Sequence, residues 1–150
     1  MSGPRPRAPD SRQWPMTSHA GASHKDMTDK VFTAIQCVAV PVADQERSKI
    51  LFEELGFTTT MDAELQPGFR WIELAATAGG TAISLVLTGD ELPTGINTGI
   101  RLLTPDARAA HAALTAKELD VGELLDWESV PLMFSFRDVD GNRFYVSQHG

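Results

Sequence analysis

The stretch that decides the fold is Phe134–Gln148, FSFRDVDGNRFYVSQ, near the end of the sequence. Two short runs with alternating apolar residues flank Asp140, Gly141 and Asn142. These three residue types accept, at low cost, the positive φ angles that tight hairpin turns demand. The stretch therefore predicts a β-hairpin.

The faces of this hairpin differ in character. Successive side chains of a strand point to opposite sides of a sheet. One face then carries Phe134, Phe136, Phe144 and Val146, and the other carries Tyr145 and Ser147. We expect the first face to pack on a core and the second to line a ligand cavity.

Composition places the chain among globular proteins. It has 150 residues, of which 42% are hydrophobic and 22% charged, enough for one domain with a real core. A single cysteine excludes an internal disulfide. The sequence contains neither a membrane-spanning apolar run nor a signal-peptide pattern, so we expect a cytoplasmic protein without membrane partners.

Charge is distributed unevenly along the chain. Residues 1–30 carry five Lys/Arg and three Asp/Glu, whereas residues 31–150 carry eight Lys/Arg and seventeen Asp/Glu. An acidic body repels phosphate backbones, which argues against nucleic-acid binding. Residues 1–29, rich in Pro, Ser, Gly and Ala, are predicted to be a disordered tail ahead of a single domain at 30–150.

The pattern after the tail predicts one strand, one helix and three strands. The expected elements are a strand at Val31–Val42, a helix between an Asp44 cap and Gly56, a short strand at Phe57–Met61, a strand at Phe69–Ala75, and a strand containing Ile83, Leu85 and Leu87.

The same order then recurs. The expected elements are a strand at Ile96–Leu103, a helix capped by Thr104 with Ala109, Ala113 and Ala116 on its apolar face beside Leu114, a short strand at Val121–Trp127, and hairpin strands at Met133–Arg137 and Arg143–Gln148. The sequence thus predicts an α+β fold of two βαβββ modules, at about 31–90 and about 96–149.

Three segments resemble the vicinal oxygen chelate superfamily, the group of glyoxalases, bleomycin-resistance proteins and ring-cleaving dioxygenases. They are VAVPVADQERSKILFEELGF (Val38–Phe57), TGIRLLTPDARAAHAAL (Thr98–Leu114) and FRDVDGNRFYV (Phe136–Val146). The last is similar to the family's D-P-D-G-N hairpin, with Val139 in place of the proline. The resemblance implies a curved mixed sheet around a concave cavity, with helices on the convex side.

The resemblance also implies where a metal would be held. The family's four ligand positions fall on Cys37, Ser84, Gly99 (or Thr98, if the alignment slips by one) and Tyr145. Metal enzymes of the family have His, Glu or Gln there, and only Cys37 is a plausible ligand in this chain. None of its four histidines sits at a metal-ligand spacing with another. We therefore expect no metal and no cofactor.

Strand alternation predicts the lining of the cavity. The ligand-binding residues we expect are Cys37, Phe69, Trp71, Glu73, Ser84, Arg101, Tyr145 and Ser147. Each has an alternative role: Trp71 as a packing or dimer-contact residue, Arg101 in a salt bridge to Glu73, and Cys37 as a small buried filler.

Two classes of function fit these features. The first is a metal-free protein of the bleomycin-resistance kind that binds or sequesters a small hydrophobic or aromatic molecule, as a homodimer. The second is a metal-independent isomerase or lyase that uses Glu73, Tyr145 or Arg101 as acid, base or electrostatic stabiliser. An interaction protein with an unused cavity is a third, weaker possibility.

Overall fold

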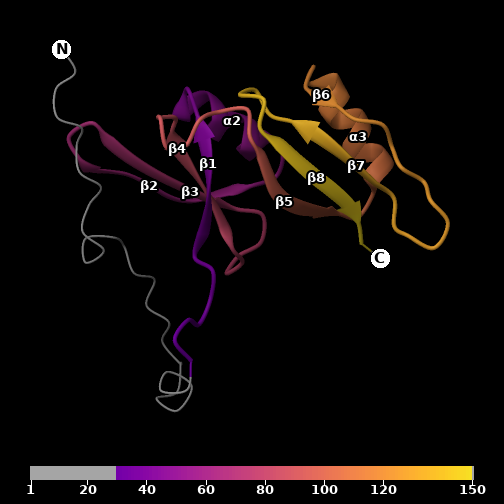
Figure 1. The fold of residues 1–150 in the computed structure, drawn as a ribbon, viewed down its shortest axis with the longest axis horizontal. Helices are drawn as coiled ribbons and strands as arrows, with labels where there is room; N and C mark the ends of the chain where they lie inside the picture. The colour runs from indigo at the N-terminus through magenta and orange to yellow at the C-terminus, as the bar shows by residue number, and fades with distance from the viewer. Residues whose placement is uncertain (1–29, 150) are drawn as a thin grey trace. The chain divides into compact units, whose positions relative to one another are not determined.

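The computed structural model describes residues 30–149, so the predicted tail at 1–29 lies outside the described residues. The elements run in the order β1 (Cys37–Val42), α2 (Gln45–Glu54), β2 (Thr58–Gln66), β3 (Phe69–Ala75), β4 (Ala82–Leu87), β5 (Asn97–Thr104), α3 (Ala107–Ala116), β6 (Asp120–Val121), β7 (Met133–Arg137) and β8 (Arg143–Gln148) (Figure 1). The predicted α+β fold of two βαβββ modules is confirmed.

Three predicted boundaries were wrong. The first strand begins at Cys37 rather than Val31, and residues 31–36 are exposed and outside any strand. The second strand continues to Gln66 because it pairs with β3 along its whole length. The strand predicted at Val121–Trp127 shrinks to β6, followed by an isolated bridge between Leu125 and Met133.

Residues 30–149 form two compact units, and each is described by itself. The first unit comprises residues 30–38 and 52–84. It contains the antiparallel pair β2–β3, with β4 on the other side of β3. Ile72 and Leu74 of β3 are fully buried, and Phe52 packs edge-on against Phe57, with ring centroids 5.4 Å apart.

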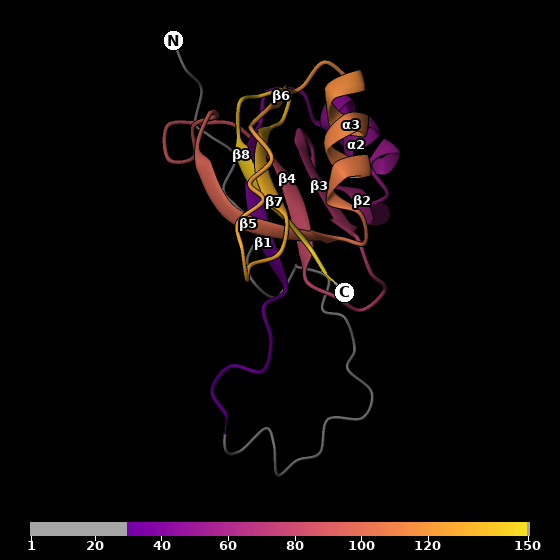
Figure 2. The ribbon, with the colours of Figure 1, turned by 90° about the vertical axis from the view of Figure 1, so that its right-hand side faces the viewer.

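The second unit comprises residues 39–51 and 85–149. Its sheet has the order β5-β8-β7-β6, with β5 parallel and β7 antiparallel to β8. Helix α3 lies on one face of this sheet (Figure 2). His111 of α3 meets Phe134 edge-on at 5.1 Å, and Phe136 stacks on Phe144 at 5.4 Å. The predicted core face of the hairpin is thus confirmed.

The turn between β7 and β8 is closed by its own polar side chains. The Asp138 carboxylate accepts hydrogen bonds from the backbone N–H groups of Asp140 and Asn142. Gly141 has a φ of 81°, a conformation that costs glycine little. Burial raises the pKa of Asp138, while these backbone hydrogen bonds act against the rise.

Asn142 ties this turn to two other segments of the second unit. Its side chain is fully buried, donates to the Pro41 carbonyl at 2.7 Å, and accepts from the N–H groups of Gly95 and Ile96. It also donates to Asp138. One side chain therefore satisfies four neighbours from β1, the connector before β5, and the hairpin.

Asp140 makes a second set of contacts from the same turn. Its carboxylate accepts from the backbone N–H of Ala43, from the Arg47 guanidinium at 3.1 Å, and from the Ser48 hydroxyl. These groups surround the start of α2, where the predicted Asp44 cap accepts from the N–H of Arg47. The turn between β7 and β8 thus stabilises the junction of β1 and α2.

Helix α3 begins differently from the prediction. Its cap is Asp106, which accepts from the N–H of Ala109, rather than Thr104, whose hydroxyl accepts from the N–H of Asp106. Its buried residues are Ala107 and Leu114, so the predicted alanine face was wrong. No helix within residues 30–149 is long and apolar enough to cross a membrane.

Candidate ligand-binding site

A row of side chains crosses the second sheet on the face opposite α3. Phe134 meets α3, so its strand neighbour Ser135 points the other way. Ser135 pairs with Tyr145, and Tyr145 pairs with Arg101 on β5. Register alone thus aligns one residue from each of three strands.

These residues line a pocket of about 340 Å³. Its walls come from β5, β7, β8 and the segment that follows β6. The lining residues are Arg101, Glu123, Leu125, Met133, Phe134, Ser135, Tyr145, Val146 and Ser147. The lining combines apolar surface with a few polar groups, as small-molecule pockets do.

Tyr145 is the most constrained polar group of this pocket. The Arg101 guanidinium lies over its ring, 4.3 Å from the centroid, in a cation–π contact. The side-chain amide of Asn97 donates to its hydroxyl oxygen at 2.7 Å. This hydrogen bond holds the pKa of Tyr145 below its ordinary value, and the nearby Arg143 and Arg101 act in the same direction.

A bulge in β5 brings Asn97 to Tyr145. Asn97 pairs with Arg143, but the next regular pair is Arg101 with Tyr145, so three residues of β5 oppose one of β8. Gly99 lies inside this bulge with a φ of 70°, and its N–H donates to the Asn97 side-chain oxygen. That bond fixes the Asn97 amide with its nitrogen toward Tyr145. Bulges that re-aim a side chain are common beside functional sites.

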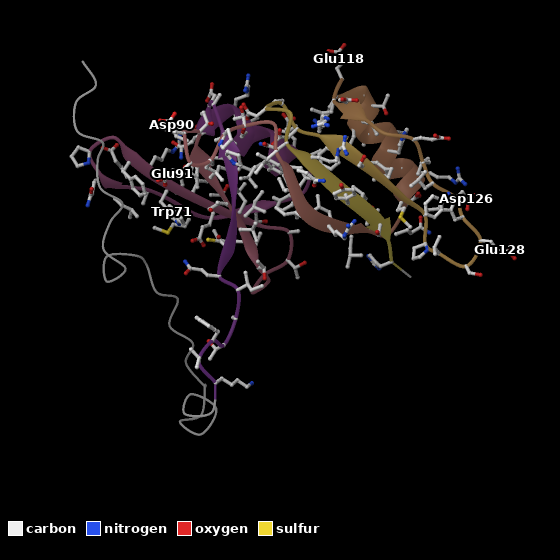
Figure 3. The ribbon with its side chains drawn as sticks, viewed as in Figure 1. Trp71, Asp90, Glu91, Glu118, Asp126 and Glu128 are labelled. Atoms are coloured by element: carbon white, nitrogen blue, oxygen red, sulfur yellow. The ribbon has the colours of Figure 1, made fainter. Side chains whose placement is uncertain are left out.

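The first unit holds a separate group of the predicted residues. Trp71 of β3 (labelled in Figure 3) is 7% exposed and donates its indole N–H to Glu73 at 2.8 Å. Gln36 donates to the same carboxylate oxygen at 3.2 Å. Phe69 stacks on Trp71 with ring centroids 6.2 Å apart. Trp71 is therefore largely buried.

Cys37 and Ser84 belong to this group as well. Ser84 pairs with Glu73 across the sheet, and its buried hydroxyl has no hydrogen-bond partner within residues 30–149. The Cys37 thiol lies beside that hydroxyl without reaching hydrogen-bond geometry. Burial raises the pKa of Cys37, and the Glu73 carboxylate adds to the rise. The thiol therefore stays protonated at neutral pH.

The eight predicted site residues thus fall into two groups. Arg101, Tyr145 and Ser147 share the pocket of the second unit. Cys37, Phe69, Trp71, Glu73 and Ser84 lie in the first unit. Arg101 contacts the Tyr145 ring, and the Glu73 carboxylate accepts hydrogen bonds from Gln36 and Trp71. These are not the partners that the alternative salt bridge between Arg101 and Glu73 requires.

Six of the nine lining residues were not among the predicted site residues, and two of the six, Phe134 and Val146, were predicted for the core instead. Ser135 and Met133 share the parity of Tyr145 across the hairpin, so strand alternation in β7 could have found them. Glu123 and Leu125 follow β6 in a segment without regular structure, where no periodic signal exists.

The four family ligand positions do not fit a divalent metal. Cys37 offers a single thiol, and Gly99 has no side chain. At the alternative position, the Thr98 hydroxyl donates to the Arg143 carbonyl at 2.6 Å. No group of three or more His, Cys, Asp or Glu side chains suited to a metal is found within residues 30–149. Such a donor set matches neither zinc nor the hard cations.

Comparison with solved structures gives close matches in fold. TnmS3, an antibiotic-binding protein from Streptomyces sp. CB03234, has a TM-score of 0.70 and 27% identity over 81% of this chain and 99% of that chain. A glyoxalase/bleomycin resistance protein/dioxygenase superfamily member from Sphaerobacter thermophilus DSM 20745 has a TM-score of 0.69 and 26% identity over 79% of this chain and 98% of that chain.

A third match comes from the same Streptomyces strain as TnmS3. A glyoxalase/bleomycin resistance protein from Streptomyces sp. CB03234 has a TM-score of 0.65 and 28% identity over 77% of this chain and 100% of that chain. No protein-family model matches the chain, and no curated protein matches it. The order of elements and these three structures agree: the chain has the fold of the vicinal oxygen chelate superfamily.

Proposed function

We propose that this protein binds a small hydrophobic or aromatic molecule without a metal, in the manner of antibiotic-binding and resistance proteins. The observation that carries the proposal is the pocket on the face of the β5-β8-β7 sheet opposite α3, about 340 Å³ in volume. Ligand pockets of proteins have volumes of roughly 300–1,000 Å³.

The chemistry of the lining supports this reading. Leu125, Met133 and Val146 offer apolar surface, and Met adapts its shape to irregular ligands. The Tyr145 ring is held in place by contacts on its face and at its hydroxyl. A preorganised ring loses little conformational entropy when a ligand arrives.

The similar structures support the same class of function. One of them is described as an antibiotic-binding protein and another as a glyoxalase/bleomycin resistance protein. The four family metal positions carry Cys37, Ser84, Gly99 and Tyr145 in place of His, Glu or Gln, which supports sequestration over the family's metal chemistry. That Cys37, Phe69, Trp71, Glu73 and Ser84 of the first unit bind a ligand stays a separate proposal.

The test is a thermal-shift screen of the full chain against a panel of aromatic antibiotics, followed by calorimetry on each hit. A ligand that binds only the folded form raises the melting temperature. At a ligand concentration a hundredfold above Kd, the free energy of unfolding rises by about 2.7 kcal/mol. We expect at least one hit whose binding is unaffected by EDTA.

A pocket-filling variant locates the binding. Ser147→Trp places a large ring in the pocket and should abolish the thermal shift. Ile50→Trp is the control, because Ile50 is 48% exposed on α2 and is not part of the lining. Hits that survive Ser147→Trp, or that require added metal, would contradict the proposal.

A metal-independent isomerase or lyase is the second candidate. The lowered pKa of Tyr145 beside Arg101 favours it, because a phenol of this kind can exchange a proton with a bound substrate. Turnover of any hit, detected by mass spectrometry and lost in Tyr145→Phe while binding persists, would establish this alternative. Glu73→Gln tests the other predicted acid–base residue in the same assay.

We further propose a cytoplasmic homodimer, on the grounds of sequence and resemblance given above. Sedimentation velocity over a range of concentrations measures the assembly directly. A single species of monomer mass at all concentrations would refute the homodimer.

A further inference from the structure

We infer that the pocket selects aromatic ligands that carry an acceptor oxygen, such as a carboxylate or phenolate, and that Tyr145 and Arg101 bind this oxygen together. This inference rests on the proposed binding function and specifies its ligand class. It follows from the direction of the Tyr145 hydroxyl, from the state of Arg101, and from the other charges around the pocket.

The hydroxyl of Tyr145 is oriented by its neighbours. The Asn97 amide nitrogen donates to the phenol oxygen, and the Asn97 amide cannot turn because its oxygen accepts from the N–H of Gly99. The phenol oxygen already accepts a hydrogen bond, so its own proton points elsewhere and is free to be donated. A ligand oxygen is the natural acceptor for a donor held in this way.

Arg101 supplies the charge. No ion pair or side-chain hydrogen bond of Arg101 is found within residues 30–149, and its guanidinium carbon lies 4.3 Å from the centroid of the Tyr145 ring. An arginine side chain carries five N–H donors, and those of Arg101 remain available to a ligand. Arg143, also close to the phenol oxygen, adds positive potential from the neighbouring strand.

Negative groups near the pocket are few or already engaged. Glu123 is the one carboxylate of the lining. Asp126 is paired with Arg108 at 3.2 Å, and both Asp126 and Glu128 lie on the outlying loop between β6 and β7 (Figure 3). Glu123 is therefore the group that competes with this assignment, and the experiment must separate its effect from that of Tyr145 and Arg101.

The experiment compares two probes that share a naphthalene ring and carry opposite charges, 2-naphthoate and 2-naphthylmethylammonium, by calorimetry on the full chain at pH 7. The ring system is common, so the difference in Kd reports on the charged group. A hydrogen bond to a charged group changes affinity by about tenfold or more. We expect naphthoate to bind at least about tenfold more tightly than the ammonium probe.

Substitutions assign the preference to residues. Tyr145→Phe keeps the ring and the cation–π contact, and should weaken naphthoate about tenfold while leaving the ammonium probe unchanged. Arg101→Gln should weaken naphthoate as well. Arg108→Gln changes the net charge equally from the exposed surface of α3 and should leave both affinities within twofold.

The outcomes separate this inference from the binding function. Equal affinities for the two probes, or no effect of Tyr145→Phe, would overturn the inference while the binding function stands. Tighter binding of the ammonium probe would assign selectivity to Glu123 and would also overturn it. Binding of neither probe would refute the assigned ligand class, and a panel without hits would then refute the binding function itself.

Discussion

Replacement of Asn142 by alanine should destabilise the protein more than most single substitutions can. The side chain is fully buried, and its loss takes this donor from the Pro41 carbonyl and from the Asp138 Oδ2 atom, and leaves the N–H groups of Gly95 and Ile96 without an acceptor. An unsatisfied buried polar group costs about 1–3 kcal/mol. Gly95 is exposed, so its N–H can donate to water instead. The other three groups therefore account for most of the loss in stability.

The expected loss is therefore about 3–5 kcal/mol in the free energy of unfolding. A domain of this size has a total stability of about 5–15 kcal/mol, so the variant should approach the limit of folding. Urea denaturation followed by circular dichroism measures the change, with the slope of the transition checked for constancy.

Asn97→Ala is the contrasting variant, because the Asn97 side chain is exposed although it makes two hydrogen bonds. Water can replace both of them, so the expected loss stays below about 1 kcal/mol. A loss below 1 kcal/mol for Asn142→Ala, or equal losses for the two asparagines, would refute the reasoning that burial makes these hydrogen bonds expensive to lose.

Three further predictions follow from the site and its surroundings. Gly99→Ala meets no steric contact but forces a side chain into a φ of 70°, so urea denaturation should show a loss of about 1–2 kcal/mol. Cys37 should react with iodoacetamide more slowly than free cysteine at pH 8, because burial and then the charge of Glu73 raise its pKa. Since the folded form resists ionising this thiol, stability should fall as pH rises above the ordinary cysteine range, and Cys37→Ser should remove that fall. Trp127→Ala should change the free energy of unfolding by less than about 0.5 kcal/mol, because its side chain is 59% exposed.

The large apolar side chains made the core predictable. Phe134, Phe136, Phe144 and Val146 recur at period two, and only one face of a sheet can bury four such residues together. Apolar periodicity predicted the buried face poorly in α3, because alanines occur on every side of this helix. Burial of an alanine side chain contributes too little free energy to distinguish one face from another. The larger Leu114, which was predicted to lie beside the apolar face, is on the buried side.

Interactions among neighbouring polar residues were harder to predict from the sequence. Thr104 and Asp106 are both good capping residues, and the position of the first helical turn selected Asp106. The bulge at Gly99 has no periodic signal, since one glycine in a strand is compatible with regular pairing. Its consequence, the contact of Asn97 with Tyr145, could not be predicted without the register of two strands that are distant in sequence.

The candidate site was therefore only partly accessible from the sequence. Alternation identified Tyr145 and Ser147 because they flank buried residues of β8. It also placed five residues of the first unit on one face, where Trp71 and Glu73 bind each other. The orientation of a hydroxyl or a guanidinium depends on neighbours that only the folded chain brings together.

The bond between Asn142 and Pro41 also bears on how the protein is made. The two residues are 101 positions apart, so a growing polypeptide cannot form this link until synthesis has passed Asn142. Before that moment the Pro41 carbonyl lacks the hydrogen bond from the Asn142 amide. Contacts of such long sequence separation slow folding and leave strands exposed meanwhile. Ribosome-bound chains that stop short of the last hairpin should accordingly depend on chaperones.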